Sequence, residues 1–476
     1  MPILMNNRNT SIYNKEVTMA TRDKREYLTT TPVPKLILSL SVPTILSMLV
    51  TAIYNTADTF FVSRVSTDLD ISTAATAAVG LSFTVMAIIQ AIGFFCGHGS
   101  GNYLSRMLGR GDMKEANEMA STGFALALII GFTMAILGNI YMPSIAAFLG
   151  PDSAQSLIYT EDYLSIILWG APFMMAQFVI NNQLRFQGSA IYAMIGLMSG
   201  AVINMILDPL LILGFHMEVK GAAIATVSGQ IMSFIVLLAG TKHGGNIRLK
   251  PSNVKLNPHY LLEILNGGAP SLCRQGLAAV STFLLNKQAG SFGGDAAIAG
   301  MSITTRVIMM MASALIGFGQ GYQPVCSFNY GAGLKNRVKE GYWFCVKYAT
   351  VFLCIVGAIC FYFAPDVIAI FNKKPEVIAV GKVALRWQSV TLPLSGILVI
   401  SNMMLQSIGK GVKASITASA RNGIFFIPLI FILPQIFGVL GVEMTQAWAD
   451  ICSLMVTVPL AFSELRQFDV EMGKEL

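Results

Sequence analysis

The chain has 476 residues, of which 54% are hydrophobic and 12% are charged, with a formal net charge of +7 and a mean hydropathy of +0.63. Folded as a soluble globule, it would leave large apolar patches in water, so its solvent is predicted to be lipid. The sequence contains no phosphate-binding loop and no plausible nucleophile–base set, which argues against an ATP-driven pump or a membrane enzyme. We therefore expect no enzymatic activity and no cofactor.

In chain order, residues 1–33 are polar and predict a flexible cytoplasmic tail. Twelve apolar stretches follow, each with the roughly 20 residues that a helix needs to cross a bilayer. Their length and their lack of alternating polarity favour helices over a membrane β-barrel. They lie near residues 36–63, 74–104, 118–146, 158–184, 190–215, 221–242, 259–288, 296–328, 339–371, 376–408, 412–438 and 440–464.

The twelve stretches divide into two sets of six. Residues 34–243 are predicted to form an N-terminal lobe, 244–257 a cytoplasmic linker, 258–466 a C-terminal lobe, and 467–476 a cytoplasmic tail. The predicted fold class is therefore an all-α polytopic membrane protein with twelve transmembrane helices in two six-helix lobes.

Loop charges predict the orientation. Basic residues are frequent on the side of the N-terminus and rare on the other side. The positive-inside rule then places both termini in the cytoplasm. Topology accounts for the net positive charge, so no nucleic-acid partner is expected. The basic residues on the cytoplasmic side are Arg22, Lys24, Arg25, Arg106, Arg110, Lys114, Arg185, Lys242, Arg248, Lys250, Lys255, Lys335, Arg337, Lys339, Lys410 and Lys413; those outside are Arg64, Lys220, Lys287, Lys373 and Lys374.

One block of sequence returns about 220 residues later, which indicates a tandem duplication. In so apolar a chain a duplication is typical of transporters, and it predicts two lobes related by a pseudo-twofold axis. The repeated glycines lie inside predicted membrane helices, where small residues allow close packing. The block contains Gly80, Gly97, Gly99 and Gly101, which return as Gly300, Gly317, Gly319 and Gly321; Pro172 and Gly221 pair with Pro393 and Gly441.

Two carboxylates are predicted at membrane depth, where a charge is costly and usually functional. Asp58 lies in the first span on the same helical face as Asn55. Asp208 lies in the fifth span, and Asn204 precedes it by one turn on the same face. Pro209 lacks an N–H, so it predicts a bend beside this acid.

Counting residues from the helix ends places Asp58, Asp208, Tyr163 and Thr226 at about the same depth, roughly 7–9 Å below the outer end at 1.5 Å per residue. We expect them to form one layer. Two close carboxylates in a low dielectric cannot both remain charged without a large cost, so one takes a proton or both share a cation. The oxygens of Asp58, Asn204, Asp208 and Thr226 suit Na⁺ as well as H⁺, and the sequence does not separate the two ions.

These motifs together resemble the multidrug and toxic compound extrusion (MATE) family, in its DinF-like branch of the MepA type. The motifs are Asp58 in its helix, Asn204-x-x-x-Asp208-Pro209, and Gly221-Ala222-Ala223-x-Ala225-Thr226-x-x-x-Gln230. The resemblance covers essentially the whole chain after residue 33. It implies a bacterial inner-membrane antiporter that works by alternating access, with a cation-coupling site formed by Asp58, Asn204, Asp208, Tyr163 and Thr226.

The C-terminal lobe is predicted to lack this site. Asp450 is the only other acid that we place deep in the membrane, and we expect it to pair with a neighbouring residue rather than to couple transport. At an offset of 220, Asn204 pairs with Ile424, Asp208 with Pro428 and Thr226 with Gln446; alignment on Pro43 and Pro270 pairs Asp58 with Leu285.

The expected function is cation-coupled export of organic, cationic amphipathic compounds by a monomer embedded in lipid. Aromatic rings beside Asp58 can stack on flat cations. The candidate substrate-binding residues are Tyr54, Asn55, Phe60, Phe61, Arg274 and Gln275.

Three alternatives stay open. A lipid-linked sugar flippase would use a basic cavity, and an exporter of anionic metabolites would use Arg274 with Arg306. A receptor with a transporter-derived body is the third. The basic residues in or near helices that would line a flippase cavity are Arg274, Arg306, Lys347, Arg386 and Arg421.

Overall fold

The computed structural model describes residues 24–62, 69–150, 153–244 and 247–474, all of whose regular secondary structure is helical. Within these ranges the side chains of 52–62, 69–70, 73, 243–244 and 474 are not described. Eleven of the described helices are long and apolar enough to cross a membrane. One of them, at Pro258–Gly331, contains two of the predicted spans, so the predicted twelve-helix fold is confirmed.

The N-terminal group follows a short helix at 24–30. It consists of α2 (Val33–Val62), α3 (Leu69–Arg110), α4 (Met113–Ile140), α5 (Met142–Phe148), α6 (Ala154–Phe186), α7 (Ala190–Pro209), the π-helix η1 (Leu210–Gly214) and α8 (Glu218–Gly244). The π-helix begins directly after Pro209, where the sequence predicts a helix disruption.

The C-terminal group starts with the 3₁₀-helix η2 (Pro251–Asn253) and the 74-residue α9 (Pro258–Gly331). Gly294 breaks α9 with φ 61°, a conformation that glycine adopts without steric cost, so α9 comprises two spans. There follow α10 (Lys335–Tyr362), α11 (Ala364–Phe371), α12 (Pro375–Ser407), α13 (Gly411–Ser419), the π-helix η3 (Ala420–Ile424), α14 (Phe426–Phe437) and α15 (Val439–Lys474). Residues 467–474 of the predicted tail thus continue α15.

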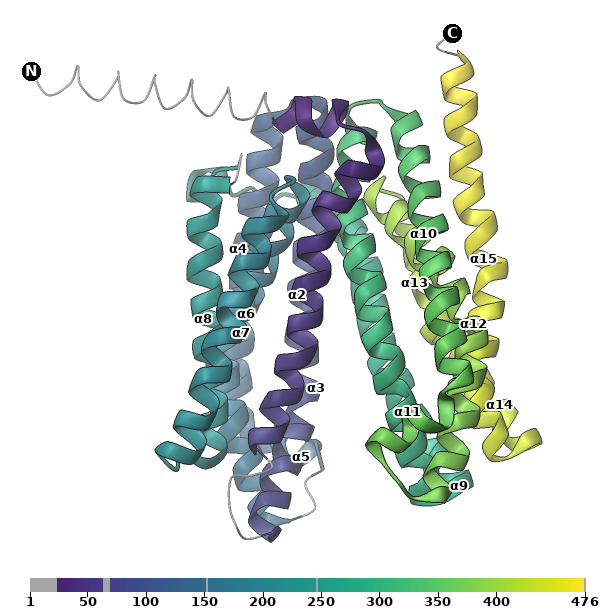
Figure 1. Cartoon of the computed structure of the whole chain (residues 1–476). Coiled ribbons are helices and arrows are strands. Elements are labelled where there is room, and N and C mark those ends of the chain that lie inside the picture. The colour runs from purple at the N-terminus through teal and green to yellow at the C-terminus, as the bar shows by residue number, and fades with distance from the viewer. Residues whose placement is uncertain (1–23, 63–68, 151–152, 245–246, 475–476) are drawn as a thin grey trace, which may run out of the picture.

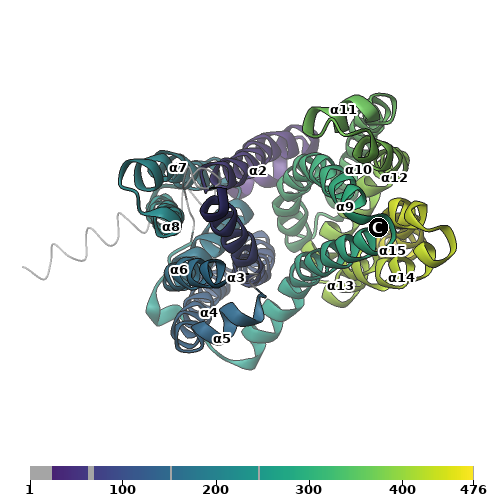
Figure 2. The same cartoon turned by 90° about the horizontal axis from the view of Figure 1, so that it is seen from below.

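The two helix groups lie side by side as two lobes (Figures 1 and 2). They are closest at the end where α2 begins and α15 ends, which we call the proximal end (Figure 1). They diverge toward the distal end, which carries α5 and α11. The helices of the two lobes are therefore nearer to one another at the proximal end than at the distal end (Figure 1).

Two predicted spans are each divided by a proline. The stretch at 118–146 is α4 and the short α5, and the stretch at 339–371 is α10 and the short α11. Pro143 and Pro365 lie in the first turns of the short helices, where their missing N–H breaks no hydrogen bond. Hydrophobicity continues through both breaks, which is why the apolar pattern did not reveal them.

The structural repeat is offset by 221 or 222 residues rather than 220. The helices α4 and α10 each have 28 residues and begin 222 residues apart, whereas α6 and α12 each have 33 and begin 221 apart. The same shift relates the side-chain hydrogen bond from Asn181 to the carbonyl oxygen of Ala193 to that from Asn402 to Ala414. The repeated glycine runs therefore align two residues out of structural register.

Glycines allow the lobes to touch backbone to backbone at the proximal end. A Cβ at Gly99 of α3 would lie 2.4 Å from the carbonyl oxygen of Ile264 in α9, and one at Gly331 of α9 would lie 2.1 Å from that of Arg106. A Cβ at Gly321 would lie 2.5 Å from the Cα of Ser41 in α2. These approaches confirm that the glycine repeat serves helix packing.

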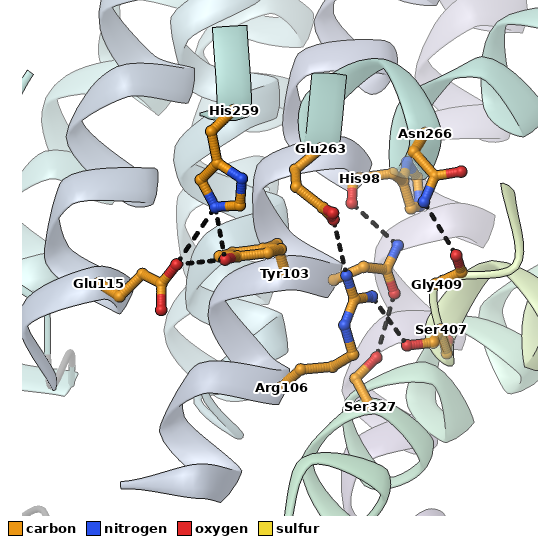
Figure 3. A network of polar contacts seen from close by, with 11 residues as sticks. His98, Tyr103, Arg106, Glu115, His259, Glu263, Asn266, Ser327, Ser407 and Gly409 are labelled. Atoms are coloured by element: carbon orange, nitrogen blue, oxygen red, sulfur yellow. Dashed lines mark hydrogen bonds and ion pairs between the residues drawn. The ribbon is translucent and has the colours of Figure 1, made fainter. Parts of the chain in front are cut away.

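A polar network reinforces the same junction (Figure 3). Arg106 of α3 forms a salt bridge with Glu263 of α9 at 3.2 Å and donates to the carbonyl oxygen of Ser407 at 3.2 Å. On the C-terminal side of the junction, Asn266 donates to the carbonyl oxygen of Gly409 at 2.9 Å. The sequence places Arg106 in a loop, but it is a buried helical residue that links the lobes.

The linker between the lobes is held along α4. The backbone N–H groups of Arg248 and Lys255 donate to Asn117 Oδ1 at 2.7 Å and Thr122 Oγ1 at 2.9 Å. That of Lys250 donates to Ser121 Oγ at 3.2 Å. The linker is too irregular to pair its own backbone N–H groups, so side chains of α4 accept hydrogen bonds from them.

Candidate functional site in the N-terminal lobe

A cavity of about 270 Å³ lies inside the N-terminal lobe, between α2, α3, α6, α7 and α8. Its wall combines methionine and aromatic side chains with uncharged polar groups, a lining that suits amphipathic organic molecules. The residues that line it are Met48, Thr51, Phe83, Met86, Ala87, Gln90, Phe94, Met174, Gln177, Phe178, Asn181, Leu197, Gly200, Ala201, Asn204, Thr226, Gly229, Gln230 and Ser233.

Two glycines bring α7 and α8 together beside this cavity. A Cβ at Gly200 would lie 2.6 Å from the carbonyl oxygen of Gly229, and a Cβ at Gly229 would lie 2.7 Å from that of Gly200. Larger residues would force the helices apart. The close contact positions Asn204, one turn after Gly200 on α7, beside Thr226, about one turn before Gly229 on α8.

Asn204, Thr226 and Asp208 meet at this helix pair. The amide group of Asn204 lies 3.4 Å from the hydroxyl of Thr226. In the orientation that satisfies both amide atoms, the nitrogen donates to Asp208 Oδ2 and the oxygen accepts from the backbone N–H of Thr226, each at 3.3 Å. Asn204 and Thr226 line the cavity, and Asp208 lies behind Asn204 with 0% exposure.

Tyr163 of α6 is also fully buried. Its hydroxyl donates to the sulfur of Met86 at 3.7 Å, and Met86 lines the cavity. The structure therefore brings the sequence-predicted Asn204, Asp208 and Thr226 together and places Tyr163 near the same cavity. The side chains of Tyr54, Asn55, Asp58, Phe60 and Phe61 lie outside the described residues, so their proposed roles stay predictions.

The other polar residues of the cavity wall were not predicted as a binding site. Gln177 and Asn181 lie one turn apart on α6, and Gln230 follows Thr226 by one turn on α8. Polar residues at i, i+4 spacing in a membrane helix are a usable signal, because an amide is expensive in contact with lipid. The cavity was missed because its wall combines several helices.

The corresponding part of the C-terminal lobe holds an ion pair. Arg421 donates from Nε to Asp450 Oδ1 at 2.7 Å and from Nη2 to Oδ2 at 3.1 Å, and Gln446 donates to Oδ1 at 2.9 Å. The expectation that Asp450 is paired is confirmed. It is not the only other buried acid, however, because Glu443 and Glu464 of α15 are 5% and 1% exposed.

The basic residues that would line a flippase cavity are dispersed among the described residues. Arg421 pairs with Asp450, and Arg386 donates to the carbonyl oxygen of Phe361. Arg306 and Lys347 are exposed. Arg274 is half-buried in α9, and neither it nor Gln275 lines the N-terminal cavity.

Comparison with known proteins decides the family. Residues 43–210 and 270–432, which cover both lobes, match the family model described as MatE. The chain belongs to the MatE family. It is therefore a membrane transporter and not an enzyme, and the resemblance predicted from the intramembrane motifs is confirmed.

Similar proteins and structures agree with this assignment. Multidrug export protein MepA of Staphylococcus haemolyticus (strain JCSC1435) is 27% identical over 442 residues, which cover 92% of this chain and 95% of the relative. The protein of the same name from Staphylococcus aureus (strain MSSA476) is 27% identical over 434 residues, covering 90% and 93%.

Two solved structures match with a TM-score of 0.86 and 25% identity. One is an outward-facing conformation of a multidrug resistance MATE family transporter of the MOP superfamily, covering 93% of this chain and 98% of that chain. The other is a MOP superfamily transporter from Pyrococcus furiosus, covering 94% and 98%. The two-lobe fold of the MATE-family chain is thereby established.

Proposed function

We propose that this MATE-family protein is a cation-coupled multidrug exporter, in which entry of H⁺ or Na⁺ through the N-terminal lobe drives the exit of an organic cation. The observation that carries the proposal is the position of Asn204. Its amide contacts Asp208 on one side and the cavity on the other. The name of the similar proteins, multidrug export protein MepA, supports the substrate class.

Charge on Asp208 is the proposed link between ion and substrate. A carboxylate one side chain away from an uncharged cavity attracts an organic cation, because the dielectric screening inside the lobe is weak. Binding of H⁺ or Na⁺ at Asp208, with Asp58 as the second acid, neutralises that attraction and makes Asp208 a weaker acceptor for the Asn204 amide. The organic cation then binds less tightly and leaves.

The apolar part of the substrate would contact the flexible and aromatic side chains of the wall. Met48, Met86 and Met174 can adapt to different shapes, and Phe83 can contact a flat cation with its ring face. Such a wall binds many related molecules rather than one.

We place the protein as a monomer in the bacterial inner membrane, with both termini in the cytoplasm. The proximal end is then cytoplasmic, and the lobes diverge toward the outside (Figure 1). The structure would thus correspond to the state from which substrate leaves. Breaking the proximal junction and closing the distal end would give the opposite state.

The test is uptake of ethidium into everted membrane vesicles under separately imposed proton and sodium gradients. We expect uptake under at least one gradient, and loss of at least about 90% of it in Asp208→Asn, because an uncharged amide cannot exchange the coupling ion. Asp162→Asn is the matched control. Asp162 lies next to Tyr163 in sequence but forms a partly exposed salt bridge with Lys220 at 3.2 Å.

Full uptake by Asp208→Asn, present at the normal level in the membrane, would contradict the proposed coupling. Uptake that responds to neither gradient would contradict antiport itself. Equal losses in Asp208→Asn and Asp162→Asn would show that the assay reports general damage to the lobe.

A further inference from the structure

Two arginines lie near each other where the lobes meet, and neither forms a salt bridge with a carboxylate among the described residues. Arg185 is near the end of α6 and is 1% exposed, whereas Arg274 is half-buried in α9. They are close enough to repel each other electrostatically. Arg106, which is also buried, pairs with Glu263, and the half-buried Arg421 pairs with Asp450.

Arg185 is held by neutral groups only. It donates to the side-chain oxygens of Gln320 and Asn182, and Nη2 lies 3.2 Å from His98 Nε2. Its buried Nε has no acceptor among the described residues. The carboxyl-terminal dipole of α6 offsets part of its charge, since Arg185 lies in the last turn.

Arg274 is even less compensated. It lies within a span of α9, away from either end of that helix, and its only hydrogen bond among the described residues goes to Asn402 Oδ1 at 3.3 Å. A guanidinium carries five N–H donors and prefers a bidentate carboxylate or phosphate. A charge so placed in a membrane protein is costly unless something completes its coordination.

Arg185 lies just beyond one end of the N-terminal cavity, and Arg274 is near enough to Arg185 and His98 to act on both electrostatically. The rings of Phe94 and Phe178 line that end with centroids 4.8 Å apart. Phe94 also stacks on His98, which contacts Arg185. Asn181 of the cavity wall lies one turn before Arg185 on α6. An elongated molecule in the cavity would therefore direct one end toward these cations.

We propose that Arg274, assisted by Arg185, forms an anion-recognition subsite that binds the carboxylate of zwitterionic amphipathic substrates. The apolar and cationic part of such a molecule would occupy the cavity, where Asp208 attracts the cation, and its carboxylate would reach Arg274. The inference rests on the proposed export function. It assigns a recognition site for the carboxylate that a purely cationic substrate lacks.

The test compares a rhodamine ester, which is a cation, with its free acid, which is a zwitterion. Binding of each to the full chain is measured by fluorescence anisotropy in phosphatidylcholine nanodiscs. We expect Arg274→Gln to weaken binding of the acid about tenfold and to leave the ester within about twofold, because only the acid loses a charge-assisted bidentate contact. Arg274→Lys, which keeps the charge, should recover part of the loss. Arg386→Gln is the control for loss of a distant C-terminal cation.

The outcomes separate the inference from the proposed function. If the ester binds and the acid is unaffected by Arg274→Gln, the subsite is wrong and the export proposal stands. If both dyes weaken equally, Arg274 is structural and the subsite is also wrong. If neither dye binds the unmodified chain, the export proposal itself fails. Displacement of the acid by phosphatidylglycerol added to the nanodiscs would reassign the subsite to lipid phosphate.

Discussion

The last two spans of each lobe follow the same connectivity but differ in chemistry. In the N-terminal lobe, Gly200 and Gly229 bring α7 against α8, and an amide and a hydroxyl lie between Asp208 and the cavity. At the structural offset of 221, these glycines correspond to Arg421 and Asp450, which form a salt bridge in the C-terminal lobe. The two positions hold closely packed glycines in the N-terminal lobe, and the equivalent positions of the C-terminal lobe hold a salt bridge.

The difference indicates which lobe can respond to an ion. A guanidinium already neutralises Asp450, so adding a proton or a sodium ion there would first require the salt bridge to break. The N-terminal acid contacts an amide that can reorient. The π-helices follow the same division, since η1 follows Asp208 by two residues whereas η3 contains Arg421 itself. Under the proposed function, the N-terminal lobe would respond to the ion and the C-terminal lobe would support it.

The largest expected effect comes from breaking the glycine contact in the N-terminal lobe. In Gly229→Ala, the new Cβ would meet the carbonyl oxygen of Gly200, so we expect loss of gradient-driven ethidium uptake and a fall of about 1–3 kcal/mol in the free energy of unfolding. Vesicle uptake and denaturation in detergent measure the two effects. Gly214→Ala is the control, since its Cβ would meet no atom closer than 3.7 Å. Unchanged uptake in Gly229→Ala would show that close α7–α8 packing is not needed.

A second prediction concerns the ion pair of the C-terminal lobe. Asp450→Asn leaves Arg421, which is mostly buried, without its carboxylate, and should lower the free energy of unfolding by about 1–3 kcal/mol. Transport per folded molecule should persist, because the pair supports the lobe without coupling. The double variant Arg421→Gln/Asp450→Asn should regain most of the stability. Loss of gradient dependence in the stable double variant would place a coupling group in this lobe.

The smallest expected effect is at the proximal junction between the lobes, where both lobes use a glycine, Gly99 or Gly321, for close backbone contact. In Gly99→Ala, a Cβ would meet the backbone of Ile264, which penalises the proximal contact by about 1 kcal/mol after relaxation. Spin labels at the exposed positions Phe148 and Ile370, in α5 and α11, should then report a larger population with the distal ends close together. Gly276→Ala, with no neighbour within 4 Å, should leave the distance distribution unchanged. An unchanged distribution in Gly99→Ala as well would mean that this contact does not set the conformation.

Much of the fold was predictable from local patterns. Hydrophobic length gave the twelve spans, and the repeated glycines and prolines gave two copies of six. The breaks before α5 and α11 and the two-residue error in the glycine register were not predictable, because hydropathy is continuous at both prolines and glycine runs can align in more than one register. Arg106 and Arg185 were placed in loops, since an isolated sequence does not reveal that residues of the opposite lobe bury them.

The candidate site divides in the same way. Asn204 and Asp208 lie one turn apart on one helix, so their spacing predicted a shared face, and their juxtaposition with Thr226 followed the predicted depth. The roles of Asp58 and its aromatic neighbours remain predictions from sequence. The cavity wall, and the two arginines that form no salt bridge among the described residues, could be found only from the fold. Both features bring together residues that are far apart in the chain.

The sequence by itself determined the solvent, the number of spans, the duplication and the lobe that carries the Asn204 and Asp208 pair, because composition and local periodicity report how each segment contacts lipid. Tertiary structure decided that Asn204 lies between Asp208 and a cavity, that Asp450 is neutralised by Arg421, and that Arg185 and Arg274, from different lobes, lie near enough to repel each other. The physical reason is that electrostatic partners are set by distance through space, and in this chain they lie on different helices.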